Sequence, residues 1–469
     1  MNNAISVKLI NSGEVLPASM AEHAAKLCYQ PTLPPLNNCP NEAEGATMDK
    51  FVNDRLLWTG HHTTLEHQYF SFEIEGISVG DIDFGLHLAS PFYNSDQRSG
   101  RFCTDMFASP DYGQIEEYIK QFWPDISDSV RRSIMDYIRS GIGLYQDNVG
   151  RATTLVAEFL RADRPNLSDK AVAMSAPKIA QEQMRVSVPV IFPTALVFTI
   201  DLSALVALWE SAWTPVMRYI TYKMKWTVLE KYPNLIYMFD ENRRRQNDWA
   251  CQLIENGGDP LVFQPRILGV ETQNIGDCLP PEPGLLHPID RLHFTPETMD
   301  KNTATILVRA ARMSLATMGQ DQRHRTIRRG LPHFTGEFYL PPAVREVINH
   351  DEARNLFHQW RALRAEIPPS LSMITAPYGA VVCYDKAGSV NAVLHELGKR
   401  LCWCAQEEIY ELARQTRIAL GQQLPENHWL FHYLEPPCLT GGKCGEGARY
   451  CGRDLNFSDG KERITHRRV

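Results

Sequence analysis

The sequence predicts a mixed α/β (α+β) protein organised as two halves of similar size. Three observations lead to this prediction. A chain of 469 residues can form two or three domains and bury a large core. Segments with the two-residue alternation of strands are interspersed with segments that have the apolar period of helices. Residues 240–300 are rich in turn-formers and helix breakers, as in GDCLPPEPGLLHPID, which indicates a boundary near the middle.

The first half is predicted to alternate strands and helices. Alternating apolar and polar side chains predict strands over residues 6–12 (SVKLINS) and 67–76 (HQYFSFEIEG). Residues 186–209 form an apolar run with two prolines and an aspartate, which favours a core strand followed by a helix over a membrane span. Helices are predicted over residues 19–30, 48–60 (ended by Gly60) and 201–231 (capped by Asp201 or Ser203).

The second half is predicted to contain a long amphipathic helix over residues 301–325. Residues 380–420 predict a short strand, a turn at Lys386–Ser389 and then a long helix. The segments 189–209 and 376–397 share a plan of proline, strand, polar turn and helix. Two copies of one domain is therefore a hypothesis.

Composition excludes several classes of function. The net charge of -7 argues against general binding to nucleic acid or anionic membranes, because such proteins need a basic surface. The N-terminus lacks the basic, apolar and small-residue order of a signal peptide. The eleven cysteines, an odd count mostly in apolar or helical contexts, suit reduced thiols better than a disulfide framework. We therefore expect a cytoplasmic protein without a membrane segment.

One short stretch is strongly basic within this acidic chain. The stretch GQDQRHRTIRRGLPH, residues 319–333, contains Arg323, His324, Arg325, Arg328 and Arg329. The negative dipole end of a helix would account for one or two of these charges. The residues alone leave two readings open: a solvated helix end, or a site for small anions, which guanidinium groups bind well.

Two polar loops and one helical arginine are further candidates for ligand contacts. The first loop, GHHTTLEHQYFSFEI, enters a predicted strand and carries His61, Thr63, Glu66 and His67; the alternative is a polar loop with capped ends. The second, NSDQRSGRF, offers an anion a hydroxyl, a flexible backbone and a guanidinium at Ser99, Gly100 and Arg101, although most such tripeptides form plain turns. Arg400 lies on a predicted helix with an apolar face, where it needs a partner such as Glu407, Glu408 or a ligand.

The C-terminal tail suggests a metal site. The tail sequence PPCLTGGKCGEGARYCG presents Cys438, Cys444 and Cys451, with His428 and His432 just upstream. Three thiols and an imidazole can form a tetrahedral zinc site. The spacing is wider than the usual two-residue knuckle, so reduced packing cysteines are the alternative.

Taken together, these stretches resemble the flavin-dependent thymidylate synthases. Arg323-His324-Arg325 matches the family's Arg-His-Arg motif, and Gln320 matches the glutamine three residues before it. The family's loop Gly-His-x-Thr-x-x-Glu-His is matched by Gly60, His61, Thr63, Glu66 and His67. Its substrate loop is matched by Ser99-Gly100-Arg101-Phe102. Its reactive-site arginine and the following Ala-Gln-x-Glu-Ile are matched by Arg400, Ala405, Gln406, Glu408 and Ile409.

These motifs are divided between the two halves in a complementary way. The first half has Leu86-His87-Leu88 where Arg-His-Arg would stand, and the second half has no Ser-Gly-Arg loop. The resemblance therefore implies two tandem thymidylate synthase-complementing-protein-like domains, each a twisted sheet packed with long helices, that share one composite site. The expected boundaries are 1–240 for the first domain, 241–300 for a linker or insertion, 301–425 for the second domain and 426–469 for a cysteine-rich tail.

The resemblance also implies a reaction. In this family reduced flavin transfers hydride, methylenetetrahydrofolate supplies one carbon to deoxyuridylate, and NADPH reduces the flavin. It implies FAD as cofactor, NADPH and methylenetetrahydrofolate as co-substrates, and a homodimer that mimics the family's homotetramer. The residues implied to bind the flavin are His61, Thr63, Glu66, His67, His324 and Arg325. Those implied to bind the pyrimidine nucleotide are Gln320, Arg323, Ser99, Gly100, Arg101 and Arg400, and the implied catalytic residues are Arg400 and Arg323.

Two departures from the family leave the substrate open. His333 stands where the family has a serine, and the family's phosphate-binding arginine falls near Cys383 or Ala195. The candidates to replace that arginine are Arg98, Arg328 and Arg329. The leading hypothesis is methylation of deoxyuridylate. The alternatives are a divergent flavoenzyme that modifies another pyrimidine, for example by hydroxymethylation, and a catalytically silent nucleotide- or flavin-binding scaffold.

Overall fold

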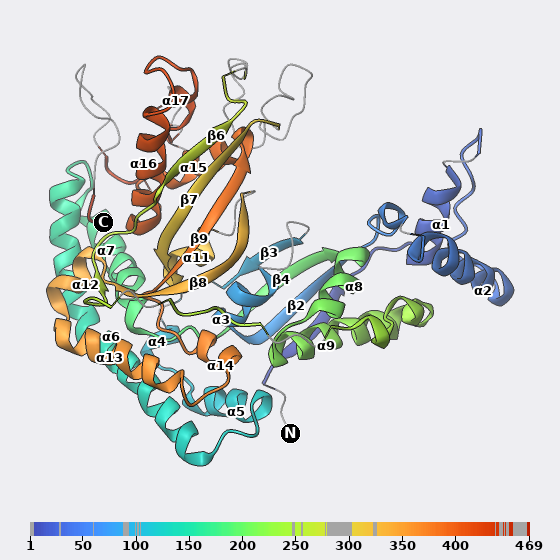
Figure 1. Cartoon of the computed structure of the whole chain (residues 1–469), viewed down its shortest axis with the longest axis horizontal. Coiled ribbons are helices and arrows are strands. Elements are labelled where there is room, and N and C mark those ends of the chain that lie inside the picture. The colour runs from blue at the N-terminus through green and yellow to red at the C-terminus, as the bar shows by residue number, and fades with distance from the viewer. Residues whose placement is uncertain are drawn as a thin grey trace.

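The structure is a computed structural model of the chain, and it contains two β-sheets flanked by helices (Figure 1). It describes residues 4–27, 30–59, 61–87, 93–98, 100, 103, 105–245, 249–254, 257–276, 278, 303–321, 326–436, 438–439, 444, 446, 450–453 and 467–469. The mixed helix and sheet content confirms the predicted fold class.

The first sheet has four antiparallel strands in the order β1-β2-β4-β3. Their bounds are Ser6–Asn11 for β1, Tyr69–Ser78 for β2, Tyr93–Gln97 for β3 and Pro193–Asp201 for β4. The alternation that predicted β2 corresponds to its burial, since Phe70, Phe72 and Ile74 are buried and face the core. The predicted strands over residues 6–12 and 67–76, and the core strand within 186–209, are confirmed.

The helices of the first half lie beside this sheet and extend beyond it at both ends of the molecule (Figure 1). They are α1 (Pro17–Leu27), α2 (Glu42–Phe51), α3 (Val79–Asp81), α4 (Asp105–Ala108), α5 (Tyr112–Phe122), α6 (Asp128–Asp163), α7 (Asp169–Met184), α8 (Leu202–Ser211) and α9 (Pro215–Lys231). Asp201 caps α8, as predicted, by accepting a hydrogen bond from the Ala204 amide at 2.7 Å. The single helix predicted over residues 201–231 is two helices, because Thr214 caps a new helix at Pro215.

Short helical turns of other types connect these elements. Two are π-helical, Val52–Leu57 directly after α2 and Ile82–Leu86 directly after α3. The 3-10 turns of the first half are His62–Thr64, Arg185–Ser187, Pro233–Met238 and Glu241–Arg243. The helix predicted to end at Gly60 therefore consists of α2 and a π-helical extension, and Gly60 itself lies outside the described residues.

The second sheet has five strands in the order β5-β8-β9-β7-β6. The strands are β5 (Leu261–Val262), β6 (Gly269–Gln273), β7 (Thr305–Ser314), β8 (Ile327–Tyr339) and β9 (Ala380–Ser389). All neighbours are antiparallel except β5 and β8. The segment 241–300, expected to be a linker or insertion, thus supplies two strands to this sheet.

The helices of the second half cover this sheet and reach back toward the first half. They are α11 (Leu315–Asp321), α12 (Pro342–Val347), α13 (His350–Leu363), α14 (Pro369–Ile374), α15 (Val390–Arg400), α16 (Glu407–Gly421) and α17 (Leu430–Tyr433). The long helix predicted after residue 389 is divided into α15 and α16 at residues 401–406.

Two predictions for the second half are wrong. Residues 301–325 do not form a long helix, since residues 305–314 form β7 and only 315–321 are helical. A bulge at Ala310, whose φ is 44°, shifts the inward-facing positions from Ile306 and Val308 to Ala311 and Met313, so the alternation is hidden in the sequence. The turn predicted at Lys386–Ser389 is also absent, because β9 continues through these residues.

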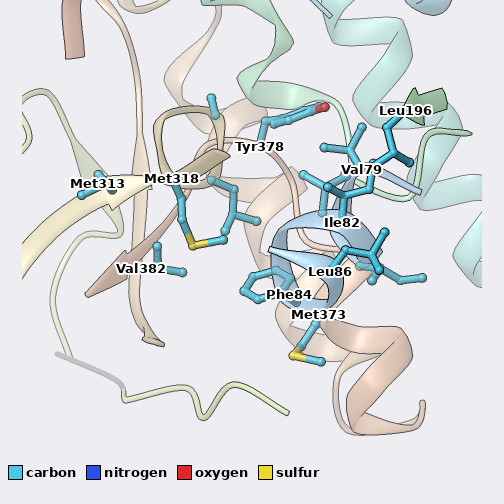
Figure 2. Close-up of a cluster of buried hydrophobic side chains, with 14 of the residues drawn as sticks. Val79, Ile82, Phe84, Leu86, Leu196, Met313, Met318, Met373, Tyr378 and Val382 are labelled. Carbon is cyan, nitrogen blue, oxygen red and sulfur yellow. The ribbon is translucent and has the colours of Figure 1, made fainter. Parts of the chain in front are cut away.

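The two halves meet at a short antiparallel contact. The Val190 amide donates to the Ala376 carbonyl at 2.8 Å, and the Tyr378 amide donates to the Val188 carbonyl at 2.8 Å. Pro189 and Pro377 lie opposite each other between these hydrogen bonds. Figure 2 shows the apolar cluster around this contact, with Val79, Ile82, Phe84, Leu86 and Leu196 from the first half and Met313, Met318, Met373, Tyr378 and Val382 from the second. We call this region the junction.

The end of the chain also packs against both halves. Arg468 forms an ion pair with Asp163 of α6 at 2.5 Å, and Val469 is buried. Arg467 donates to the Trp403 carbonyl at 2.9 Å, within the turn that separates α15 from α16. Among the described helices, none combines the length and apolar character needed to cross a lipid bilayer.

Candidate functional site

Arg185 is a buried charged side chain in the junction. It begins the 3-10 turn after α7 in the first half and is 6% exposed. Its Nη2 donates to the Ala316 carbonyl at 2.9 Å and to Gln406 Oε1 at 3.2 Å, both in the second half. Its guanidinium also stacks over the Tyr378 ring, with its carbon 5.1 Å from the ring centroid.

Gln320 and Arg400, both predicted from motifs, join Arg185 in one hydrogen-bonded group. Gln320 lies on α11, and its Nε2 donates to the same Gln406 Oε1 that Arg185 contacts. Arg400 is the last residue of α15, and its Nη2 donates to the Gln320 carbonyl. Gln406 stands at the N-cap of α16, so the break between α15 and α16 places Arg400 and Gln406 beside Gln320.

Gly100 brings the predicted substrate loop of the first half to the same place. Gln181 Nε2 donates to the Gly100 carbonyl at 2.8 Å and to the Cys103 carbonyl at 3.0 Å. A Cβ added at Gly100 would lie 3.8 Å from Arg185 Nη1. The substrate loop and the Arg185 turn of the first half therefore converge with α11, the end of α15 and the start of α16 in the second half. We call Gly100, Arg185, Gln320, Arg400 and Gln406 the junction cluster.

The junction cluster contains polar atoms without a partner. Gln320 Oε1, Gln406 Nε2 and Arg185 Nε are buried and have no hydrogen-bond partner within the described part of the chain. Unpaired buried donors and acceptors are costly and uncommon in folded proteins. Together they offer one acceptor and two donors, a set that suits a polar ligand.

A buried carboxylate supports the backbone of this cluster. Glu408 accepts hydrogen bonds from the Ser314 amide at 2.7 Å and from Thr317 Oγ1 at 2.6 Å, which holds the start of α11 against α16. Burial raises the pKa of Glu408, and the hydrogen bonds from Ser314 and Thr317 and the nearby Arg185 oppose this rise. Glu408 thus anchors the helix that carries Gln320.

Several predicted site residues lie outside the described residues. These are Ser99 and Arg101 of the substrate loop and Arg323, His324 and Arg325 of the Arg-His-Arg motif. Of the described residues that flank the second motif, Asp321 accepts a hydrogen bond from the Tyr384 hydroxyl and Thr326 donates one to Glu396. The roles of the five motif residues outside the described part remain predictions.

The predicted flavin loop does not join the junction cluster within this chain. His61, Thr63 and Glu66 lie around the 3-10 turn that precedes β2, and His61 and Thr63 are exposed, as is His67. The ten-residue strand β2 begins next to this loop and has its other end at Ser78, beside the junction residue Val79. At about 3.3 Å per residue, a strand of this length spans roughly 30 Å.

Arg98 and Arg328, two of the residues proposed to replace the phosphate-binding arginine, contact other side chains. Arg98 is half-exposed and lies 3.9 Å from Glu75, and the guanidinium carbon of Arg328 lies 5.4 Å from the centroid of the Tyr384 ring. His333 pairs with Cys383 across β8 and β9, and burial together with the nearby Arg312 lowers its pKa. Arg185 occupies the junction instead.

The tail cysteines give no support to the predicted zinc site. No group of three or more His, Cys, Asp or Glu side chains is arranged to hold a metal ion in the described ranges, which include Cys438, Cys444 and Cys451. Burial raises the pKa of the Cys438 thiol to about 11 and also raises that of Cys451.

Arg185 and Gln181 are the site residues that motif reasoning missed. Arg185 lies between Met184 and Val186, both fully buried, at the start of the apolar run that leads into β4. A lone arginine at the start of such a run is the signal that could have identified it, because a buried charge needs a specific partner. Gln181 carries no comparable signal, since polar residues are common on helices.

Comparison with known families confirms the resemblance over the first half. Residues 13–217 match the model of the family described as thymidylate synthase complementing protein. The match includes the histidine loop, the Ser-Gly-Arg loop and Arg185. A comparison with curated proteins finds no match.

Similar solved structures are distant. Thymidylate synthase X from Helicobacter pylori, solved with FAD and dUMP, is 15% identical, with a TM-score of 0.34 over 52% of this chain and 100% of its own. The UMP/dUMP methylase PolB from Streptomyces cacaoi, bound with 5-Br dUMP, is 14% identical, with a TM-score of 0.28 over 50% of this chain and 94% of its own.

Proposed function

We propose that this chain is a flavin-dependent enzyme that transfers one carbon to a pyrimidine nucleotide bound at the junction of its two halves. The leading reaction is reductive methylation of deoxyuridylate to thymidylate, with FAD as cofactor and methylenetetrahydrofolate and NADPH as co-substrates. One observation carries this proposal. Gly100, Gln320 and Arg400, predicted from three separate motifs, converge on Arg185 and Gln406.

The chemistry of the junction cluster suits a pyrimidine nucleotide. A uracil ring offers two carbonyl acceptors and one N–H donor, which complement the unpaired atoms of Gln320, Gln406 and Arg185. Arg400 is our choice to stabilise negative charge on a pyrimidine carbonyl oxygen, which makes carbon five of the ring nucleophilic.

The flavin would be held by a different surface. When bound, FAD supplies the hydride that reduces the transferred carbon. His61 and Thr63 are exposed donors at the start of β2, and a second copy of the chain could bring this loop to the junction cluster of the first. We therefore propose a homodimer, which the molar mass of the purified protein in solution would test.

We also propose that the two halves are repeats of one ancestral domain. Ignoring β5, the strand order β6-β7-β9-β8 follows the same plan as β1-β2-β4-β3, and all of these pairs are antiparallel. β4 and β9 each lead directly into a helix, capped by Asp201 and by Ser389. This common plan supports the tandem arrangement predicted from the divided motifs.

The reaction can be tested directly. We expect the purified protein to bind FAD and to convert deoxyuridylate to thymidylate in the presence of methylenetetrahydrofolate and NADPH. Arg400→Met should abolish turnover, whereas Arg132→Met, an exposed arginine on α6, should not. A hydroxymethylated product would identify the divergent flavoenzyme, and a protein that binds no FAD would indicate the silent scaffold.

The composite nature of the site has a separate test. Arg185→Ala and Gln406→Ala should each weaken deoxyuridylate binding by about tenfold, because each removes one partner of a buried hydrogen bond across the junction. In the double variant the effects should be coupled by about 0.5–3 kcal/mol. The exposed pair Arg139 and Asp136, 2.8 Å apart, is the matched control and should show neither effect. Strictly additive losses would contradict a shared site.

A further inference from the structure

A lysine is buried between two carboxylates behind the junction cluster. Lys386 Nζ lies 2.6 Å from Asp321 Oδ1 and 2.5 Å from Glu396 Oε1. The side chains are 11%, 3% and 6% exposed, so all three are shielded from water. Burial opposes the charge of Lys386, but Asp321 and Glu396 raise its pKa above the usual value. We call these three residues the Lys386 triad.

The triad connects the two ends of the Arg-His-Arg segment. Asp321 directly precedes residues 322–325, and Thr326 directly follows them. Thr326 Oγ1 donates to Glu396 Oε2 at 2.8 Å, while Lys386 contacts the other oxygen of the same carboxylate. Asp321 is further held by the Tyr384 hydroxyl at 2.6 Å. Lys386 therefore sets the positions of both flanking residues relative to β9.

The triad is also linked to Gln320 and Arg400. Gln320 is the neighbour of Asp321 on α11, and Arg400 lies one turn after Glu396 on α15. Burial alone would raise the pKa of the Asp321 carboxyl, but Lys386, Tyr384 and Arg400 outweigh it and lower the pKa. The charges of Lys386 and Arg400 thus balance those of Asp321 and Glu396.

An apolar side chain fits the corresponding place in the first sheet. Ser78 at the end of β2 pairs with Pro193, and Ser314 at the end of β7 pairs with Val381, so Pro193 and Val381 occupy equivalent positions in the two sheets. Counted from these positions, Phe198 of β4 corresponds to Lys386 of β9. Phe198 is fully buried, and its ring centroid lies 5.3 Å from that of Tyr93. Buried ion pairs generally stabilise a fold less than well-packed apolar side chains of similar volume. Stability alone therefore does not account for a lysine at this place.

We propose that Lys386 is a positioning residue for the nucleotide site. It holds Asp321 and Glu396 so that Gln320 and Arg400 face the nucleotide, and it fixes both ends of the segment that carries Arg323, His324 and Arg325. This inference rests on the proposed function, because it assigns the triad to the same site. Lys386 itself does not touch the nucleotide.

Three variants separate positioning from stability. Lys386→Met removes the cation, Lys386→Arg keeps it, and the triple variant Asp321→Asn, Lys386→Met and Glu396→Gln makes all three members of the triad neutral. The exposed Lys399 on α15 supplies the control Lys399→Met. Each variant is characterised by its Tm, by its dissociation constant for deoxyuridylate, and by kcat and KM.

We expect the triple variant to keep a Tm near that of the unchanged protein. It should bind deoxyuridylate about tenfold to a hundredfold more weakly, because a small misplacement of the binding groups has effects of this size. Lys386→Arg keeps the cation, so its dissociation constant for deoxyuridylate should lie within about threefold of that of the unchanged protein. This change is smaller than the tenfold change that corresponds to about 1.4 kcal/mol. A triple variant with unchanged deoxyuridylate binding would overturn the proposal, even if Lys386→Met alone fails to fold.

Hydrogen exchange distinguishes failure of this inference from failure of the proposed function. If the unchanged protein binds no deoxyuridylate, the proposed function fails, whereas the triad can still be assessed in the ligand-free protein. We expect faster amide exchange around Gln320 and Thr326 in the triple variant than in the unchanged protein, with α13 unaffected. Equal exchange at these residues would show that the triad does not position them.

Discussion

Burial makes Glu407 a much weaker acid than an exposed glutamate. Its side chain lies at the start of α16, next to Gln406, and accepts a hydrogen bond from the Tyr339 hydroxyl at 3.3 Å. Burial, together with the nearby Glu182 and Glu408, raises its pKa from 4.5 to about 8. The carboxyl is therefore protonated in the folded protein at neutral pH, although it is ionised in the unfolded chain.

This raised pKa predicts how stability depends on pH. The folded protein holds a proton that the unfolded chain loses near pH 4.5, so the free energy of unfolding should fall as pH rises from about 4.5 to about 8. Glu407→Gln should flatten this decline and stabilise the protein at pH 9 by about 1–3 kcal/mol, since one pKa unit corresponds to about 1.4 kcal/mol. Urea unfolding at several pH values measures the effect.

Glu366→Gln is the matched control, because Glu366 is exposed in the turn after α13. It should leave the pH profile unchanged. A Glu407→Gln protein that loses stability with rising pH as steeply as the unchanged protein would contradict the assignment.

At the level of single residues, the sequence identified candidate site residues better than it predicted their structural surroundings. Gln320, Arg400 and Gly100 were identified by motif, and the structure brings them together. Lys386 was predicted to lie in a turn, because a polar, glycine-containing stretch is typical of turns. Lys386 instead lies in β9, paired with Val308 and Arg328, and one of its ion-pair partners, Asp321, lies 65 residues away in the sequence. No local pattern reveals a partner at that distance.

Among the helices, α6 illustrates how closely the elements pack at the junction. A Cβ added at Gly141 of α6 would lie 2.4 Å from the Ser187 carbonyl oxygen, in the turn that begins with Arg185. The Ser187 hydroxyl donates to the Gly141 carbonyl at 3.0 Å. Two residues further along the same helix, a Cβ added at Gly143 would meet nothing within 4 Å.

The two glycines should therefore respond in opposite ways to alanine. Gly141→Ala should destabilise the protein by about 1–3 kcal/mol, because the methyl group forces α6 away from Ser187. Gly143→Ala should stabilise it by about 0.5–1 kcal/mol, because alanine loses less backbone entropy in a helix. Urea unfolding of both variants measures the difference. Equal effects would show that α6 does not approach Ser187 this closely.

The element predictions succeeded where the side-chain period was regular and failed where it was broken. β2 keeps its alternation over Phe70, Phe72 and Ile74, and its strand was predicted. β7 contains leucine, alanine, arginine and methionine, which favour helices, and its bulge at Ala310 interrupts the alternation. Its strand identity comes from pairing with β6 and β9 on both sides, which is tertiary information.

The molecule as a whole has one continuous core. The buried apolar side chains of both halves belong to a single cluster, and the junction contributes residues from each (Figure 2). In addition, α6 of the first half packs against α12 and α13 of the second. The two halves are thus joined by more than their covalent connection.

We expect this core to unfold cooperatively. Chemical denaturation followed by tryptophan fluorescence and by far-ultraviolet circular dichroism should give coincident transitions, because opening the junction exposes core from both halves. The chain carries tryptophans in each half, including Trp209 and Trp360, which are both fully buried. Two separate transitions would indicate that the halves are stable independently of the junction.

The short contact at Pro189 and Pro377 has a consequence for how this protein can vary. The two segments that meet there are encoded at different places in one gene, so a codon change alters one side of the contact and leaves the other intact. A selection experiment could therefore randomise codons 181–190 while codons 373–379 stay constant, and then reverse the roles. Each face of the junction is thus an independent target for directed evolution, including selection for activity on a different pyrimidine substrate.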